Sequence, residues 1–234
     1  GLESGDAAVL TSGQVAGLTS KQVNALNSDQ VGALGTQAVG ALQSWQLRAL
    51  STEQGLVGLT SDQVAVLRGA QLLGLSTTQV GALSTDQVAA LTTSALRSLG
   101  SLQLRGMISA QVAALTTAQA AALGSGQFAG FETEALNALE SDDAAALTSV
   151  QMGGFGTREL SALNSDAMAA LSGNAIKGLT TVALRGLTSD QVKALTSEQV
   201  SGLRSSQLAS LTTEALLGLE SGDAAVLTSG QVAG

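Results

Sequence analysis

The chain has 234 residues, a formal net charge of −8, and no histidine, cysteine or proline. The lack of histidine and cysteine excludes Ser-His-Asp triads, Cys-His dyads, and histidine or thiolate metal sites. The lysines and arginines are scattered singly, which disfavours the clustered basic groove of a nucleic-acid-binding protein. Hydrophobic residues make up 44% of the chain, so intrinsic disorder is not expected.

Eight-residue units, here called octads, fill the chain. They run from Glu3 to Leu50, are interrupted by a nine-residue unit from Ser51 to Leu59, and resume at Thr60 with the same phase to the end. We number each octad from 1 to 8, so that position 8 is the leucine at its end. The extra residue, near Gly55, is predicted to be a tolerated insertion in an exposed connection, with a local bulge as the alternative.

Each octad repeats one residue pattern. Position 8 is leucine in nearly every copy, position 5 is mostly valine or leucine, and position 7 is small or β-branched. Position 2 is serine or threonine in every copy except those with Gly69 and Gly173, and position 4 is usually glutamine. Positions 3 and 6 vary freely and hold most of the charge.

This pattern predicts a short helix that ends and restarts in every octad. Positions 5 and 8 have opposite parity, so a β-strand would place them on opposite faces of a sheet. Their spacing of three places them on one face of a helix. A continuous helix does not fit either, because eight residues at about 100° each leave the apolar stripe roughly 80° out of phase per octad.

The hydroxyl residues are the expected helix starts, since serine and threonine side chains accept hydrogen bonds from the free N–H groups of a first turn. The strict residue choice favours position 2 as the N-cap, with helix over positions 3 to 7. Position 1 is the alternative, because Thr188 and Gln191 have the spacing of a capping box. The predicted caps are Ser20, Ser61, Ser189, Ser197 and Thr213, and the predicted core residues are Leu187, Val192, Leu195, Val200 and Leu203.

Helices this short are unstable alone and persist only by packing on neighbours. We therefore predict an all-α solenoid, a superhelix of very short helices with one helix per octad, formed by residues 1–234 as a single continuous array. A β-solenoid is the alternative fold, because serine, threonine and valine are plentiful and glutamine can form ladders.

No residue cluster predicts catalysis, so an enzyme is not expected, and neither is a cofactor, a metal or a small-molecule substrate. The densest acidic cluster is Glu140, Asp142 and Asp143, which lies at capping and exposed octad positions. Acidic residues in a first turn favour the helix dipole, which is the predicted structural role of this cluster. The chain has no run of 18 apolar residues, so no membrane-spanning segment is predicted.

A longer repeat is superimposed on the octads. Residues 1–17 are identical to residues 218–234, which defines a period of 217 residues. This identity predicts that the chain is cut from a longer array and associates with itself end to end or laterally; an engineered duplication is the alternative.

The richness in Ser, Thr, Ala, Gly, Val and Leu, the lack of Cys and the long repeat resemble the tandem arrays of giant secreted bacterial surface proteins of the adhesin and filament type. The resemblance implies an extracellular or cell-surface structural segment, such as part of a stalk, fibre or sheath. A repetitive binding surface for ice, a glycan or a mineral, built from rows of hydroxyl groups, is the alternative function.

Overall fold

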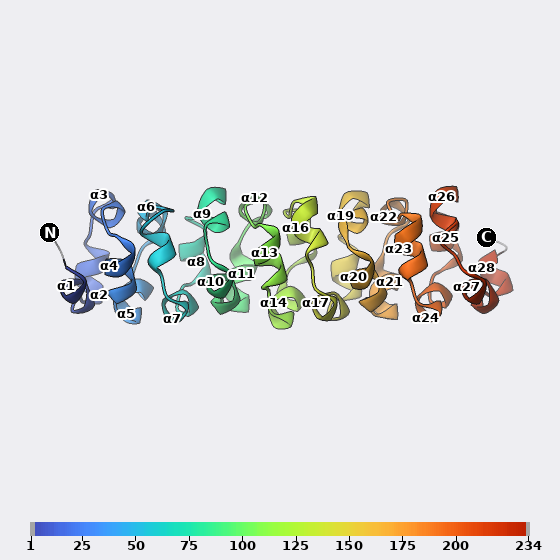
Figure 1. Ribbon diagram of the computed structural model, residues 1–234, viewed down its shortest axis with the longest axis horizontal. Helices are drawn as coiled ribbons and strands as arrows, with labels where there is room; N and C mark the ends of the chain where they lie inside the picture. The colour runs from blue at the N-terminus through green and yellow to red at the C-terminus, as the bar shows by residue number, and fades with distance from the viewer. Residues whose placement is uncertain (1–2, 233–234) are drawn as a thin grey trace. The chain divides into compact units, whose positions relative to one another are not determined.

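The computed structural model describes residues 3–232, and all of its regular structure is helical (Figure 1). These residues form 28 α-helices of four to six residues and one 3₁₀ helix, with no strand among them. The all-α prediction is therefore confirmed, and the β-solenoid alternative is wrong for the described part of the chain. With one helix in nearly every octad, the fold is a solenoid of very short helices.

Contacts between Cα atoms divide the chain into two compact units, residues 1–115 and 116–234. The octad phase continues through the boundary at Leu115 and Thr116. The helices of the first unit are α1 (Ser4–Ala8), α2 (Ser12–Ala16), α3 (Ser20–Asn24), α4 (Ser28–Ala33), α5 (Thr36–Gly40), α6 (Ser44–Ala49), η1 (Leu56–Gly58), α7 (Ser61–Ala65), α8 (Gly69–Leu72), α9 (Thr77–Gly81), α10 (Thr85–Ala90), α11 (Thr93–Ser98), α12 (Ser101–Leu104) and α13 (Ser109–Ala113).

The second unit continues the same pattern of one short helix per octad. Its helices are α14 (Thr117–Ala122), α15 (Ser125–Phe128), α16 (Thr133–Asn137), α17 (Ser141–Ala145), α18 (Ser149–Met152), α19 (Thr157–Ala162), α20 (Ser165–Ala170), α21 (Gly173–Gly178), α22 (Thr181–Leu184), α23 (Ser189–Ala194), α24 (Ser197–Ser201), α25 (Ser205–Leu208), α26 (Thr213–Leu216), α27 (Ser221–Val226) and α28 (Ser229–Val232).

Each α-helix begins at position 2 of its octad, one residue earlier than predicted. In α23, Thr188 is the N-cap, with extended backbone (φ −87°, ψ 164°), and its side chain accepts a hydrogen bond from the N–H of Gln191. Leu195, at position 8, is also extended (φ −64°, ψ 138°). Two successive extended residues, positions 8 and 1, therefore separate neighbouring helices and let the chain turn between them.

The five residues predicted as caps are the first residues of their helices instead. The prediction was wrong because a capping box pairs the cap with a polar side chain three residues later. Counted from position 2, that residue is the apolar one at position 5, such as Val192 or Leu216; counted from position 1, it is usually the glutamine at position 4. The structure places Ser20, Ser61, Ser189, Ser197 and Thr213 at N1, and the capping hydroxyls are those of Thr19, Thr60, Thr188, Thr196 and Thr212.

Helices pack against those of the third octad further along the chain. In the first unit, α3 contacts α6 and α9 contacts α12; in the second, α16 contacts α19 and α19 contacts α22. Figure 1 shows each of these pairs on the same side of its own unit. One turn of the superhelix is therefore slightly longer than three octads.

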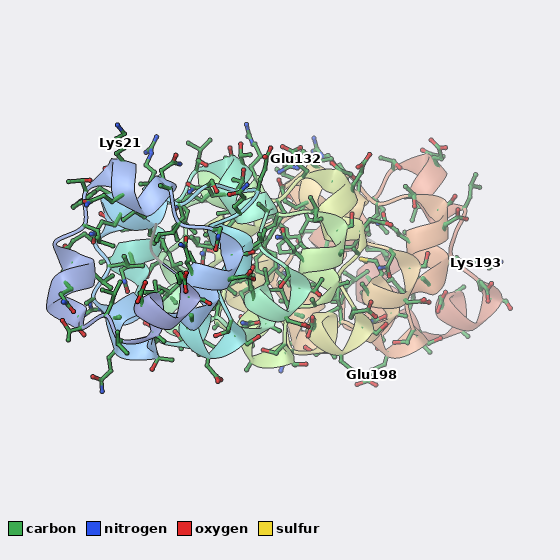
Figure 2. The ribbon with its side chains drawn as sticks, turned by 60° about the vertical axis from the view of Figure 1, so that its left-hand side comes forward. Lys21, Glu132, Lys193 and Glu198 are labelled. Carbon is green, nitrogen blue, oxygen red and sulfur yellow. The ribbon has the colours of Figure 1, made fainter. Side chains whose placement is uncertain are left out.

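Positions 5 and 8 form the core. Leu187, Val192, Leu195, Val200 and Leu203 are all buried, as are most of their counterparts in other octads. The largest fully buried side chains are Phe128, Phe131 and Phe155, and the rings of Phe128 and Phe155 lie 5.0 Å apart between centroids. Charged side chains such as Lys21, Glu132 and Glu198 extend away from the ribbon (Figure 2).

Glycine at position 7 allows the backbones of stacked octads to approach closely. A Cβ added at Gly186 would lie 2.4 Å from the carbonyl oxygen of Thr157, and one added at Gly74 would lie 2.2 Å from that of Ser44. Both partners occupy position 2 of the octad three units earlier. This contact explains why position 7 is restricted to small residues in many copies.

Candidate functional site: glutamine bridges between turns

No backbone hydrogen bond joins one turn of the superhelix to another among residues 3–232. Outside the helices, every backbone hydrogen bond in this range connects residues no more than five apart. A β-solenoid connects its turns through backbone hydrogen bonds, but this fold cannot do so. The described turns are therefore held together by side-chain packing and side-chain hydrogen bonds.

The glutamine at position 4 provides the recurrent side-chain hydrogen bonds between turns. In Gln191, Oε1 accepts from the backbone N–H of Thr188 at 3.1 Å, which completes the capping box of its own helix. Its Nε2 donates to the carbonyl oxygens of Leu160 at 3.0 Å and Leu163 at 2.7 Å, in the preceding turn. One buried side chain therefore starts its own helix and satisfies carbonyl groups at the end of another.

This arrangement, here called the cross-turn bridge, recurs along both units. Its acceptors are the carbonyls of positions 5 and 8 in the fourth octad back, 31 and 28 residues away. Since helices also pack on the third octad, one turn contains between three and four octads. Bridges are formed by Gln46, Gln63, Gln71, Gln79, Gln87, Gln103, Gln111, Gln151, Gln191, Gln199, Gln207 and Gln231.

The nine-residue unit keeps its place in this network. The bridges of Gln63, Gln71 and Gln79 span 32 and 29 residues, one more than usual. Gln87 then donates to Leu56 and Leu59 with the ordinary spacings of 31 and 28. The extra residue is therefore accommodated before Leu56. In this unit, turns and the 3₁₀ helix Leu56–Gly58 replace the α-helix. Gly55 is buried, so the prediction of an exposed connection is wrong at this residue.

Acidic residues replace glutamine at position 4 in several octads. Asp223 accepts from the N–H of Glu220 at 3.1 Å and from the hydroxyl of Ser197 at 3.0 Å. Glu159 accepts from the N–H of Gly156 at 2.8 Å and pairs with Arg158 at 2.8 Å. A carboxylate can thus keep the capping function, but it has no N–H to donate to the preceding turn.

Asp143 is the least satisfied of these acids. It is buried, and its Oδ2 has no hydrogen-bond partner. Burial raises the pKa of its carboxyl above the usual value, a hydrogen bond with Thr117 lowers it, and the charges of Glu140 and Asp142 raise it further. The cluster therefore differs from the expectation of exposed first-turn acids, since one of its three carboxyls is buried.

Within residues 3–232, no three acidic side chains are grouped so that they could hold a metal ion. In the same range, no helix is both long enough and apolar enough to cross a bilayer.

The role of position 4 was only partly visible in the sequence. The capping-box spacing of Thr188 and Gln191 indicated the Oε1 contact, but the Nε2 contacts join residues about 30 apart. Only the number of octads per turn identifies those partners, and the local pattern does not contain that number.

Comparison with known protein families identifies the repeat. The ALTTAQ repeat model matches residues 1–36, 65–93, 93–125 and 174–205, together more than half of the chain. The hexapeptide itself occurs at residues 114–119, where it supplies a core leucine, a capping threonine and a position-4 glutamine. No curated protein matches the chain. The chain is thus a tandem-repeat protein that belongs to the ALTTAQ repeat family.

Proposed function

We propose that this chain is a non-catalytic structural segment of a long fibrous or filamentous bacterial protein at the cell surface, such as part of a stalk, fibre or sheath. The observation that carries the proposal is the cross-turn bridge. Wherever it occurs, it joins one turn to the next through the same two carbonyl positions, so turns can be added without a change in the interface. The 44% apolar residues and the scarcity of charge suit a molecule built mainly from such stacking.

The partner that we propose is another copy of the chain. Residues 218–234 repeat residues 1–17, and the described part of this second copy packs on the preceding turn. Gln231 donates to Leu203 at 2.7 Å, and Ser205 donates to Gly230 at 2.9 Å. The surface that receives these contacts suits the same sequence in another molecule, which is a head-to-tail interface.

Two measurements test this function. Antibodies against the chain should label intact cells of the source bacterium, and labelling that requires permeabilised cells would overturn the proposed location. Light scattering and electron microscopy of the purified chain should show a mass that rises with concentration and particles that lengthen. A strictly monomeric species at high concentration would contradict self-association.

One structural feature favours a second candidate function, a repetitive surface for ice, a glycan or a mineral. Position 1 caps the helices, so most hydroxyls at position 2 are not consumed by capping. Some of them bond elsewhere: Ser12 donates to Gln37 at 3.1 Å and Thr157 donates to Val182 at 3.2 Å. Others, such as Thr133 and Thr181, are exposed. Rows of hydroxyls at regular spacing suit an ordered ligand.

An ice-recrystallisation assay and pull-down on polysaccharide or mineral particles test this second function. Activity should disappear in a variant with alanine at several exposed position-2 residues, and it should persist when exposed position-6 residues are changed instead. Equal losses in both variants would refute a role for the hydroxyl rows.

A further inference from the structure

The cross-turn bridges are interrupted over four consecutive octads of the second unit, slightly more than one turn. Residues 156–187 form four consecutive octads without glutamine at position 4, where they have Glu159, Ala167, Ala175 and Ala183. Helices α19, α20 and α21 of this segment pack on α16, α17 and α18 in residues 124–155, and α22 packs on α19. Both turns are therefore in contact, but the usual hydrogen bonds between them are absent.

Other side chains replace the bridges on one side of this turn. Arg158 donates from Nη1 to the carbonyl of Phe131 at 2.8 Å, and its ion pair with Glu159 holds the guanidinium in place. Asn164 donates from Nδ2 to the carbonyl of Leu139 at 3.1 Å. The octads of residues 156–171 are thus connected to the preceding turn by charged and amide donors.

The other side has no replacement. No side-chain hydrogen bond joins residues 172–187 to residues 140–155, all of which are described. The carbonyls of Met152 and Phe155, 31 and 28 residues before Ala183, have no side-chain donor. The contact there consists of buried apolar side chains and the close approach of Gly178 to the backbone of Ser149. Such packing is not directional, so a tilt breaks no hydrogen bond.

We propose that this turn is a hinge. Residues 172–187 tilt away from residues 140–155, and the side held by Arg158 and Asn164 is the axis of the motion. The role of the hinge rests on the proposed function: in a structural segment under tension, this turn bends before the bridged turns separate. The motion itself follows from the one-sided distribution of hydrogen bonds.

Distance measurements between paired spin labels test the hinge. The chain has no cysteine, so label sites can be introduced singly. Val150→Cys with Val182→Cys spans the side without bridges, and Asp166→Cys with Glu198→Cys spans a turn bridged by Gln199. All four residues occupy exposed position 3, and both pairs are four octads apart, so the second pair is a matched control.

We expect the first pair to show a tail of longer distances that the control lacks. Ala183→Gln adds two hydrogen bonds, to the carbonyls of Met152 and Phe155, and should lower the open population roughly 30-fold. Gln199→Ala should create such a tail in the control pair. Circular dichroism verifies that each variant stays helical, and equal distributions for the two pairs in the parent chain would overturn the hinge.

The two proposals fail separately in this design. Label distances report on the motion within residues 140–198 whatever the chain assembles into or where it is located. A chain that proves intracellular or monomeric would still show the tail if the hinge exists. An unchanged tail in a folded Ala183→Gln variant would contradict the hinge and leave the structural function standing.

Discussion

Replacing Gln191 by alanine tests the cross-turn bridge directly. The substitution removes three hydrogen bonds, from the N–H of Thr188 at 3.1 Å and to the carbonyls of Leu160 at 3.0 Å and Leu163 at 2.7 Å. A typical hydrogen bond contributes about 1 kcal/mol net, which gives a loss of about 3 kcal/mol. The cap survives, because the hydroxyl of Thr188 accepts from the backbone N–H of residue 191, which alanine retains.

Hydrogen exchange is the appropriate assay, because repeat arrays open locally and a global midpoint would average over many octads. A loss of about 3 kcal/mol corresponds to roughly a hundredfold loss of protection, since about 1.4 kcal/mol is tenfold. The loss should appear both in α23 and in α19, the helix that receives the bridge, and this second site distinguishes a bridge from a local capping contact. Protection that falls in α23 alone would refute the reasoning.

Gln191→Glu separates the acceptor role of the side chain from its donor role. The carboxylate keeps an acceptor for Thr188 but loses the donor and places charge against the carbonyls of Leu160 and Leu163. At neutral pH this variant should therefore lose at least as much protection in α19 as the alanine variant. Protonation at low pH supplies one O–H donor and should restore part of that protection.

Three further predictions concern the cap, the core and a buried acid. Thr188→Ala should destabilise α23 by about 1 kcal/mol and Ser189→Ala by less than about 0.5 kcal/mol, measured by hydrogen exchange; the reverse order would reinstate position 2 as the cap. Leu195→Ala should cost about 2–5 kcal/mol and Lys193→Ala less than about 0.5 kcal/mol, and equal costs would mean that the buried face is wrongly assigned. Because burial raises the folded-state pKa of Asp143, its contribution to stability is present below the unfolded pKa and is lost as pH rises through the folded pKa. Asp143→Asn should therefore gain over the parent chain in denaturant unfolding as pH rises from 3 to 7, and a constant difference would contradict this.

The helical class could be predicted from the sequence because it depends on local features of the octad. Parity and phase use only residues within one or two octads, and those residues determine whether a short helix forms. The helix start was one residue off, because the strict serine or threonine at position 2 was attributed to capping. At Ser12, Thr157 and Ser205 the hydroxyl instead donates to a carbonyl 25 residues ahead, so this position reflects contact between octads.

The bridges could not be predicted because they too depend on contacts between octads that are far apart in the sequence. Their acceptors depend on how many octads complete a turn, and that number results from the packing of many side chains together. The extra residue before Leu56 shows this dependence. It changed three pairs of spacings from 31 and 28 to 32 and 29, yet the same carbonyl positions received the bridges. Register is therefore determined by the carbonyls of positions 5 and 8, and not by the count of residues.

A helix of four to six residues has too few internal hydrogen bonds to be stable alone, and its end carbonyls need partners. The position-4 glutamine addresses both problems with one side chain, because Oε1 serves its own helix start and Nε2 serves the carbonyls of the preceding turn. Alanine at the same position gives up both contacts, and only packing remains unless another side chain donates across the turn, as Asn164 does in the octad of Ala167. The choice between glutamine and alanine at position 4 therefore decides, octad by octad, whether the recurrent hydrogen bonds between neighbouring turns are present. In a chain whose backbone makes no cross-turn hydrogen bonds in its described part, we infer that this position is the main influence on where the solenoid is stiff and where it bends.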